Sequence, residues 1–166
     1  MRREFSAGGI VLKRVEGLKS RRVEVLWLVR RPTANPEYKG NLGWSFPKGW
    51  IDDRDGGEKP GPKASGEERA SDEEMQEAAL REVREEGGVE AKILKKLPTV
   101  KVFFTDNKGN KVLKFITYYL MEYVNDCIQG VGWETAEVKW VSSDEAMKLL
   151  AYKSERELLR QAERLE

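Results

Sequence analysis

The chain has 166 residues, a length that suggests a single domain spanning residues 1–166. Its 30 basic and 29 acidic residues nearly cancel, so bulk binding of nucleic acid or of a membrane surface is not expected. The chain has no histidine, which excludes Ser-His-Asp and Cys-His catalysis and histidine-bound zinc. Acid–base chemistry must therefore come from carboxylates, lysine, tyrosine or a metal-activated water.

The single cysteine, Cys127, excludes a disulfide framework and fits a reducing compartment. The first residues lead into no apolar signal segment, and no apolar run is long enough to span a membrane. We therefore expect a cytoplasmic protein without a membrane span, and both a monomer and a homodimer remain open.

Short apolar segments predict six strands, over residues 5–13, 23–29, 44–46, 92–105, 111–124 and 138–141. A Pro/Gly/Asn loop over 32–43 and a hairpin turn over 106–110 connect neighbouring strands. Three serine–glutamate pairs with capping-box spacing predict the starts of helices: Ser71/Glu74, Ser142/Glu145 and Ser154/Glu157.

Residues 52–71, before the first predicted helix, contain almost nothing apolar. We expect this segment to be a solvated, mobile loop. In the helix that follows, Met75, Ala79 and Val83 are spaced to form a buried stripe. Gly87-Gly88 is expected to end the helix.

The last turns of this helix carry three carboxylates on one face, because Glu82, Glu85 and Glu86 stand at i, i+3 and i+4. Unpaired carboxylates at this spacing repel one another and raise each other's pKa. A divalent cation removes the conflict, and hard oxygen ligands suit Mg²⁺. Taken alone, such a helix is more often a solvated surface than a metal site.

The surrounding residues favour the metal site. The stretch from Arg81 to Val89, with Glu73 eight residues before Arg81, resembles the signature of the Nudix hydrolases, and the similarity extends over nearly the whole chain. The resemblance implies an α/β/α sandwich with a mixed β-sheet. It also implies hydrolysis of a pyrophosphate bond in a nucleoside diphosphate linked to another moiety, with Mg²⁺ or Mn²⁺ as cofactor.

The resemblance further implies roles for individual residues. Arg81 would hold the carboxylates in place, Glu82 would be the first choice of general base, and Glu134 the second. The implied metal ligands are Gly49, Glu82, Glu85, Glu86 and Glu134.

One feature departs from the family pattern. The family has five residues between the signature's glycine and its first glutamate, whereas 23 residues separate Gly49 from Glu73. Gly57-Glu58 also resembles the family's Gly-Glu pair, so the insertion can be placed on either side of it. We expect the inserted residues to form a lid or a specificity loop beside the site.

Within the family, Trp44-Ser45-Phe46-Pro47-Lys48-Gly49 and Trp133-Glu134 resemble the diadenosine polyphosphate hydrolases. The resemblance implies a small-molecule nucleotide substrate, diadenosine tetraphosphate or longer, cut to release ATP and AMP. RNA 5′-pyrophosphohydrolases have related sequences and stay open, as do other Nudix pyrophosphatases acting on ADP-ribose or nucleoside triphosphates. A non-catalytic Nudix module that senses a nucleotide is the binding-protein alternative.

Four residues are candidates for substrate contact. Lys48 is a candidate for the polyphosphate, and the aromatic rings of Trp133, Phe104 and Tyr119 are candidates for the base. Lys111 and Lys114, near the predicted hairpin, are expected to be solvated.

Overall fold

The computed structural model describes residues 1–17, 22–33, 43–106 and 108–166. Among these residues, seven strands form one sheet, in the order β6-β8-β1-β2-β9 with β3 beside β1 and β7 beside β8. The strands are β1 (Arg2–Glu16), β2 (Val23–Pro32), β3 (Lys48–Trp50), β6 (Val89–Lys96), β7 (Val100–Thr105), β8 (Lys111–Asp126) and β9 (Thr135–Val141). The sheet is mixed, because β1 and β8 run parallel while the other pairs are antiparallel.

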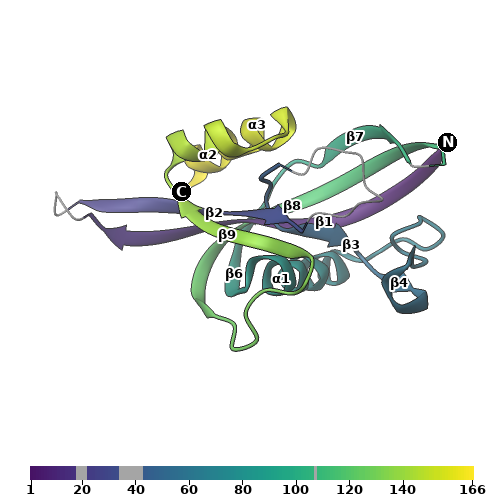
Figure 1. The fold of residues 1–166 in the computed structure, drawn as a ribbon, viewed down its shortest axis with the longest axis horizontal. Coiled ribbons are helices and arrows are strands. Elements are labelled where there is room, and N and C mark those ends of the chain that lie inside the picture. Colours follow the sequence, from purple (N-terminus) through teal and green to yellow (C-terminus); the bar gives the residue numbers. More distant parts are fainter. Residues whose placement is uncertain (18–21, 34–42, 107) are drawn as a thin grey trace.

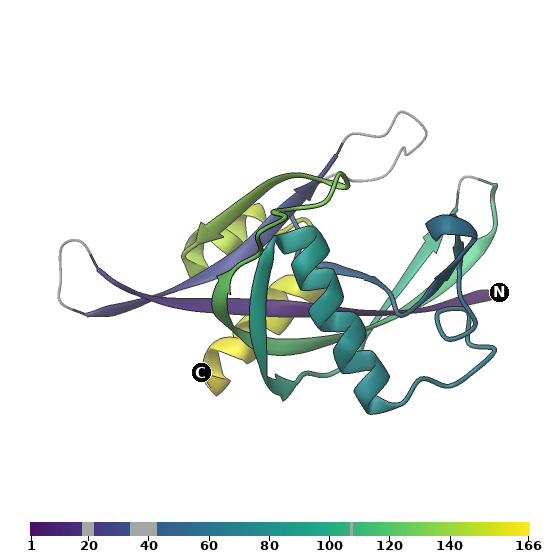
Figure 2. The same cartoon turned by 90° about the horizontal axis from the view of Figure 1, so that it is seen from below.

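Helices cover both faces of this sheet (Figure 1). The helix α1 (Asp72–Gly87) lies on one face, and α2 (Ser143–Leu149) and α3 (Lys153–Leu165) lie on the other. Figure 2 shows α1 running across the sheet. Alternating residues of β1 separate the two cores, since Ala7 and Val11 pack with α1 while Ile10 and Leu12 pack with α2 and α3. The α/β/α sandwich with a mixed sheet that the sequence predicts is confirmed.

Local sequence explains the position of α1. Ser71 accepts a hydrogen bond from the Glu74 N–H, and the Glu74 carboxylate accepts one from the Ser71 N–H, which completes the expected capping box. Gly88 ends the helix with φ of 72° and donates its N–H to the Arg84 carbonyl. Of the predicted stripe, Ala79 and Val83 are buried, while Met75 is only partly buried.

Three predicted elements were wrong in their bounds. The segment 92–105 is not one strand, because Pro98 lacks the N–H that a strand interior needs and β6 and β7 end on either side of it. Residues 44–46 make only isolated bridges, and the strand there is Lys48–Trp50. The last helix begins at Lys153 after Tyr152, so Ser154 lies inside its first turn and caps nothing.

The insertion contains structure that its polar composition did not predict. The two-residue strands β4 (Asp53–Arg54) and β5 (Lys59–Pro60) pair around the short 3₁₀ turn η1 (Asp55–Gly57). The Asp52 carboxylate accepts hydrogen bonds from the N–H groups of Lys63 and Ala64. Ala64 is fully buried, and its carbonyl accepts from the Phe5 N–H. Part of the insertion therefore packs against β1.

The loop expected over residues 32–43 lies mostly outside the described residues, which resume at Gly43. Within the parts of the chain that the structure describes, no helix is long and apolar enough to cross a membrane.

Candidate active site

The site is built where α1 meets β3. A Cβ added at Gly49 would lie 2.4 Å from both Cδ and Oε2 of Glu82, so the glycine backbone is in direct contact with this carboxylate. One turn along the helix, Glu86 Oε1 accepts the Lys48 N–H at 3.0 Å. Both glutamates are 8% exposed. Neighbouring residues of one short strand thus hold two buried carboxylates side by side.

Arg81 joins the same helix to the end of β3. Its Nη2 donates to the Trp50 carbonyl at 2.8 Å and to Glu82 Oε1 at 3.2 Å, and its guanidinium also reaches the Ile51 carbonyl at 3.3 Å. Arginine suits this contact because its planar group can donate in several directions at once. The guanidinium therefore lies against the Glu82 carboxylate and links it to the end of β3.

Arg30, near the end of β2, supports Glu86 from the other side. Its Nε lies 3.5 Å from Glu86 Oε1 and 3.2 Å from the Thr135 hydroxyl, and its Nη2 donates to the Glu134 carbonyl at 2.9 Å. The Thr135 hydroxyl in turn donates to the Glu86 carbonyl at 2.8 Å. Arg30 is buried. It therefore anchors the loop that carries Glu134 beside the C-terminal end of α1.

The pKa of Glu82 is raised to about 7, chiefly by burial and next by the neighbouring Glu86 carboxylate, while Arg81 opposes the rise. Burial also raises the pKa of Glu86, more than Arg30 and the Lys48 N–H lower it, and Glu134 is close enough to add to the rise. The two buried carboxylates therefore share an unfavourable concentration of negative charge. A cation between them would relieve it.

The donor chemistry fits Mg²⁺ or Mn²⁺, which prefer carboxylate and carbonyl oxygens. In the described residues, no three acidic, histidine or cysteine side chains already converge closely enough to hold an ion. Glu82 faces Arg81 and Glu86 faces Arg30 and Lys48, while Glu85 and Glu134 are exposed. Glu73 is exposed in the first turn of α1, two helical turns from Arg81. Cation binding would draw the carboxylates away from these partners.

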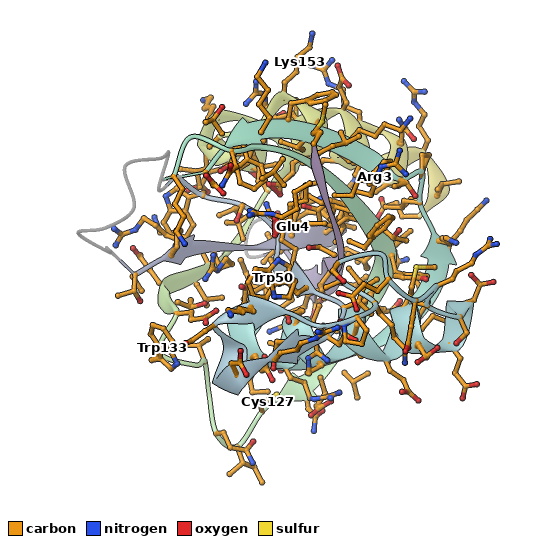
Figure 3. The ribbon with its side chains drawn as sticks, turned by 90° about the vertical axis from the view of Figure 1, so that its right-hand side faces the viewer. Arg3, Glu4, Trp50, Cys127, Trp133 and Lys153 are labelled. Atoms are coloured by element: carbon orange, nitrogen blue, oxygen red, sulfur yellow. The ribbon has the colours of Figure 1, made fainter. Side chains whose placement is uncertain are left out.

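The strand register decides which substrate candidates face the site. The α2/α3 face of the sheet carries Lys48 and Trp50 of β3 and Glu4 and Ser6 of β1. The same face carries Lys114 of β8 and Phe104 of β7. Figure 3 shows Glu4 and Trp50 close together near the centre of this end of the molecule. The Trp50 indole N–H donates to Glu4 Oε1 at 2.7 Å.

Tyr119 lies on the opposite face. Its ring is 1% exposed and packs under α1 with Val83 and Met121. A ligand cannot reach it in this conformation, because neighbouring residues of a strand point to opposite faces and Tyr118, not Tyr119, shares the face of Lys114. The prediction that Tyr119 contacts substrate is therefore wrong in this fold.

The other three substrate candidates differ in their surroundings. Phe104 is partly exposed and lines a surface pocket of about 300 Å³ with Phe103, Thr105 and Lys111. Trp133 is 83% exposed at the edge of the molecule, in the loop before β9. The Lys48 ammonium is turned inward, 3.3 Å from Glu155 Oε1 on α3.

Several residues that the fold brings here were not predicted from the sequence. Lys114 is half-buried, and burial lowers its pKa, as does the like charge of Lys48, while Glu4, Glu86 and Glu82 oppose the change. It was wrong to treat Lys114 as simply solvated. Its alternation with the buried Val112 and Ile116 was the available signal. The sequence also carried a signal for the burial of Glu155, since this residue stands three and four residues before the buried pair Leu158 and Leu159.

Comparisons with known proteins agree with this geometry. The model of the NUDIX domain matches residues 15–162. A protein of Mycobacterium tuberculosis (strain CDC 1551 / Oshkosh) named "Putative mutator protein MutT4" is 30% identical over 162 residues, which are 98% of this chain and 55% of that protein. The chain thus spans about half the length of this relative.

Solved structures share the fold. The Ap4A hydrolase of C. elegans in a binary complex superposes with a TM-score of 0.65 at 21% identity, covering 98% of this chain and 96% of that one. The NUDIX domain of Shewanella oneidensis NrtR complexed with ADP ribose gives a TM-score of 0.58 at 17% identity, covering 100% and 90%.

The NUDIX match covers most of the chain and includes β3 and α1, which carry Gly49, Arg81 and the glutamates of the site. The chain therefore belongs to the Nudix family.

Proposed function

We propose that this protein hydrolyses a pyrophosphate bond in nucleoside diphosphate-linked substrates with Mg²⁺ or Mn²⁺, and that diadenosine tetraphosphate, cut to ATP and AMP, is the preferred one. The observation that carries the proposal is the contact of two buried carboxylates, Glu82 and Glu86, with consecutive residues of β3, Gly49 and Lys48. Buried charge of one sign is costly unless it binds a cation.

The groups that would hold the cation are the carboxylates of Glu82, Glu85, Glu86 and Glu134 and the Gly49 carbonyl. Bound there, the cation would supply positive charge to neutralise the pyrophosphate oxygens and would orient a water for in-line attack on phosphorus. Arg81 and Arg30 keep Glu82 and Glu86 in place through the contacts described above. Their contribution is to fix the carboxylates before substrate arrives.

Glu82 is the first choice for the residue that takes the water's proton. Its Oε1 already accepts from Arg81 at 3.2 Å, which leaves Oε2 to accept the proton. Burial raises the pKa of Glu82, and a raised pKa makes a carboxylate a stronger base. Glu134 is the second choice, because it is exposed on the anchored loop beside Glu86.

The substrate would lie along the α2/α3 face of β1, β3 and β8. Lys114 is a cation on this face beside the carboxylates, and we add it to Lys48 as a candidate for contact with the polyphosphate. Phe104 and Trp133 offer partly and largely exposed rings on which an adenine can stack. The shared fold of the C. elegans Ap4A hydrolase supports a dinucleoside polyphosphate.

ADP-ribose is the second candidate substrate, because the NUDIX domain of S. oneidensis NrtR, which has the same fold, is complexed with ADP ribose. A panel assay tests the proposal and its alternatives together. Purified protein with Mg²⁺ or Mn²⁺ is given diadenosine polyphosphates, ADP-ribose, nucleoside triphosphates and 5′-triphosphate RNA, and the products are separated by chromatography. Turnover of none of them, with nucleotide binding retained, would favour a non-catalytic sensing module.

A further inference from the structure

Four consecutive residues, Phe46-Pro47-Lys48-Gly49, here called the 46–49 turn, carry both β3 contacts to the glutamates of α1. One residue of the C-terminal helix α3, Glu155, contacts the same turn from the opposite side. Glu155 Oε2 accepts the Phe46 N–H at 2.7 Å, and Glu155 Oε1 lies 3.3 Å from the Lys48 ammonium. These contacts bridge 109 and 107 positions of the chain.

Glu155 is 1% exposed, and burial raises the pKa of its carboxyl even though Lys48 and the Phe46 N–H lower it. Its position is otherwise apolar, since Leu158, Leu159 and Ala162 complete the buried stripe of α3. A leucine at that position would pack without desolvating a charge. The carboxylate has a specific use in this fold because both of its oxygens are engaged by the 46–49 turn.

The 46–49 turn connects Glu155 on α3 to the glutamates on α1, because Lys48 contacts both. The Lys48 ammonium faces Glu155, and the backbone N–H of the same residue donates to Glu86 at 3.0 Å. The next residue, Gly49, lies against Glu82. The ammonium also lies 4.8 Å from the centre of the Tyr152 ring, which limits its movement. Fixing Phe46 and Lys48 from α3 therefore fixes the backbone groups that meet both carboxylates.

We propose that Glu155 is a positioning residue of the active site, which holds the 46–49 turn so that the Lys48 N–H and the Gly49 backbone meet Glu86 and Glu82. The inference rests on the proposed function for its effect on catalysis. Its structural part, the coupling of α3 to the Lys48 N–H, can be measured without any turnover. Groups that orient metal ligands from behind change cation affinity by about 10- to 100-fold when removed.

Glu155→Gln tests the proposal, because it keeps the size of the side chain and removes its charge. Amide hydrogen exchange is measured by NMR for residues 46 and 48, and Mn²⁺ affinity by titration calorimetry. We expect exchange of the residue 48 amide to accelerate by at least ~10-fold and Mn²⁺ binding to weaken by about 10-fold. Glu157→Gln is the matched control, since Glu157 is on the same helix and its side chain is 60% exposed. It should change neither quantity.

A purely structural role predicts a different pattern. Leu159→Ala removes buried apolar contacts of α3 but leaves the Glu155 carboxylate and its two contacts to the turn, and it should lower Tm without changing Mn²⁺ affinity. If Glu155→Gln lowers Tm in the same way and leaves both exchange at residue 48 and Mn²⁺ affinity unchanged, the proposal is overturned. If wild-type protein neither binds Mn²⁺ nor hydrolyses nucleotides, the proposed function fails instead, and the exchange measurement still decides the role of Glu155.

If Glu155→Gln does not fold, Lys48→Met is measured instead, because it breaks the same ion pair by removing the ammonium of Lys48. It should weaken Mn²⁺ binding by a similar factor. Where both variants fold, the double variant should bind Mn²⁺ about as well as the weaker single variant, since both changes break one contact. Additive losses in the double variant would show that Glu155 does not act through Lys48 and would overturn the proposal.

Discussion

The carboxylate of Glu82 rests directly on the backbone of Gly49, with no room between them for a side chain. A methyl group at residue 49 would have to lie 2.4 Å from Glu82 Oε2. We predict that Gly49→Ala displaces the Glu82 carboxylate, weakens Mn²⁺ binding by at least ~10-fold and lowers kcat by at least ~10²-fold. Calorimetric titration and initial rates at saturating Mn²⁺ measure the two effects. Wild-type affinity in this variant would show that the contact plays no part in cation binding.

Neutralising either buried glutamate should abolish most activity. We predict that Glu82→Gln and Glu86→Gln each lower kcat by at least ~10³-fold, because a lost ligand charge weakens cation binding and transition-state stabilisation. Each variant should still fold, since an amide can accept the hydrogen bonds that Arg81 and the Lys48 N–H donate. Glu77→Gln, an exposed position on the same helix, is the control. Near-normal turnover of both variants at saturating Mg²⁺ contradicts the assignment.

The raised pKa of Glu82 predicts how stability depends on pH in the metal-free protein. A folded pKa of about 7 against the ordinary 4.5 means that the fold favours the neutral carboxyl. This contribution is fully present below pH 4.5 and is lost as pH rises through 7. The difference corresponds to about 3 kcal/mol. We therefore expect Tm without metal to fall between pH 5 and pH 8.

Metal should reverse this trend, because a cation binds only the ionised carboxylates. The rise in Tm on adding Mg²⁺ or Mn²⁺ should grow with pH over the same range. Glu82→Gln should flatten the metal-free profile, which separates the effect of Glu82 from that of other buried groups such as Glu155. Thermal unfolding by circular dichroism at several pH values provides the measurement. A variant whose profile matches the wild type would count against Glu82 as the titrating group.

The features that local pattern encodes were predictable. The capping residues of α1 and the spacing of Glu82 and Glu86 placed both carboxylates on one helix before any fold was known. The residues missed are those that meet across the chain. Arg30 reaches Thr135 over 105 positions and Glu155 reaches Phe46 over 109. Local periodicity predicts that a charged residue is buried, but it does not predict which distant group will be its hydrogen-bond partner.

The same limit explains the aromatic residues. Phe104 and Tyr119 looked alike as strand residues, yet only Phe104 shares a sheet face with Lys114. The face of each depends on how β6 and β7, on either side of the break at Pro98, pair with β8, and a shift of one residue would exchange the faces. The parallel pairing of β1 with β8, which sets Glu4 opposite Lys114, also could not be read from sequence.

The structure sharpens the prediction for the insertion. The Gly61 N–H donates to the Asp52 carbonyl at 3.0 Å, so these residues lie where the ends of a tight turn would. We predict that replacing residues 53–60 with Asn-Gly leaves Tm within a few degrees, because loop length costs little. If the hairpin formed by β4 and β5 acts as a lid, the deletion will change KM while Tm stays nearly constant. Asp52→Ala should destabilise more than the deletion, since two N–H groups lose their acceptor. Unfolding of the deletion variant would show that the hairpin itself supports the core.

The last prediction concerns the substrate. A dinucleoside polyphosphate offers more phosphate oxygens than ADP-ribose to a cation and to Lys114, and its distal adenosine can stack on Phe104 or Trp133. We expect kcat/KM for diadenosine tetraphosphate to exceed that for ADP-ribose by at least ~10²-fold, or about 2.7 kcal/mol. Products should be ATP and AMP, because water attacks away from the symmetric centre.

Lys114→Met makes this prediction specific to the proposed site. It should lower kcat/KM for diadenosine tetraphosphate by at least ~10-fold and that for ADP-ribose by less, because the longer substrate places more charge near residue 114. Lys101→Met is the control, since Lys101 is exposed on the other face of β7. Chromatography of the products and initial rates on both substrates decide the outcome. Equal rates on the two substrates, or symmetric release of two ADP, would contradict the dinucleoside assignment. The broader proposal of a Nudix pyrophosphohydrolase would stand, because the proposed cation site at Glu82 and Glu86 does not depend on what lies beyond the second phosphate.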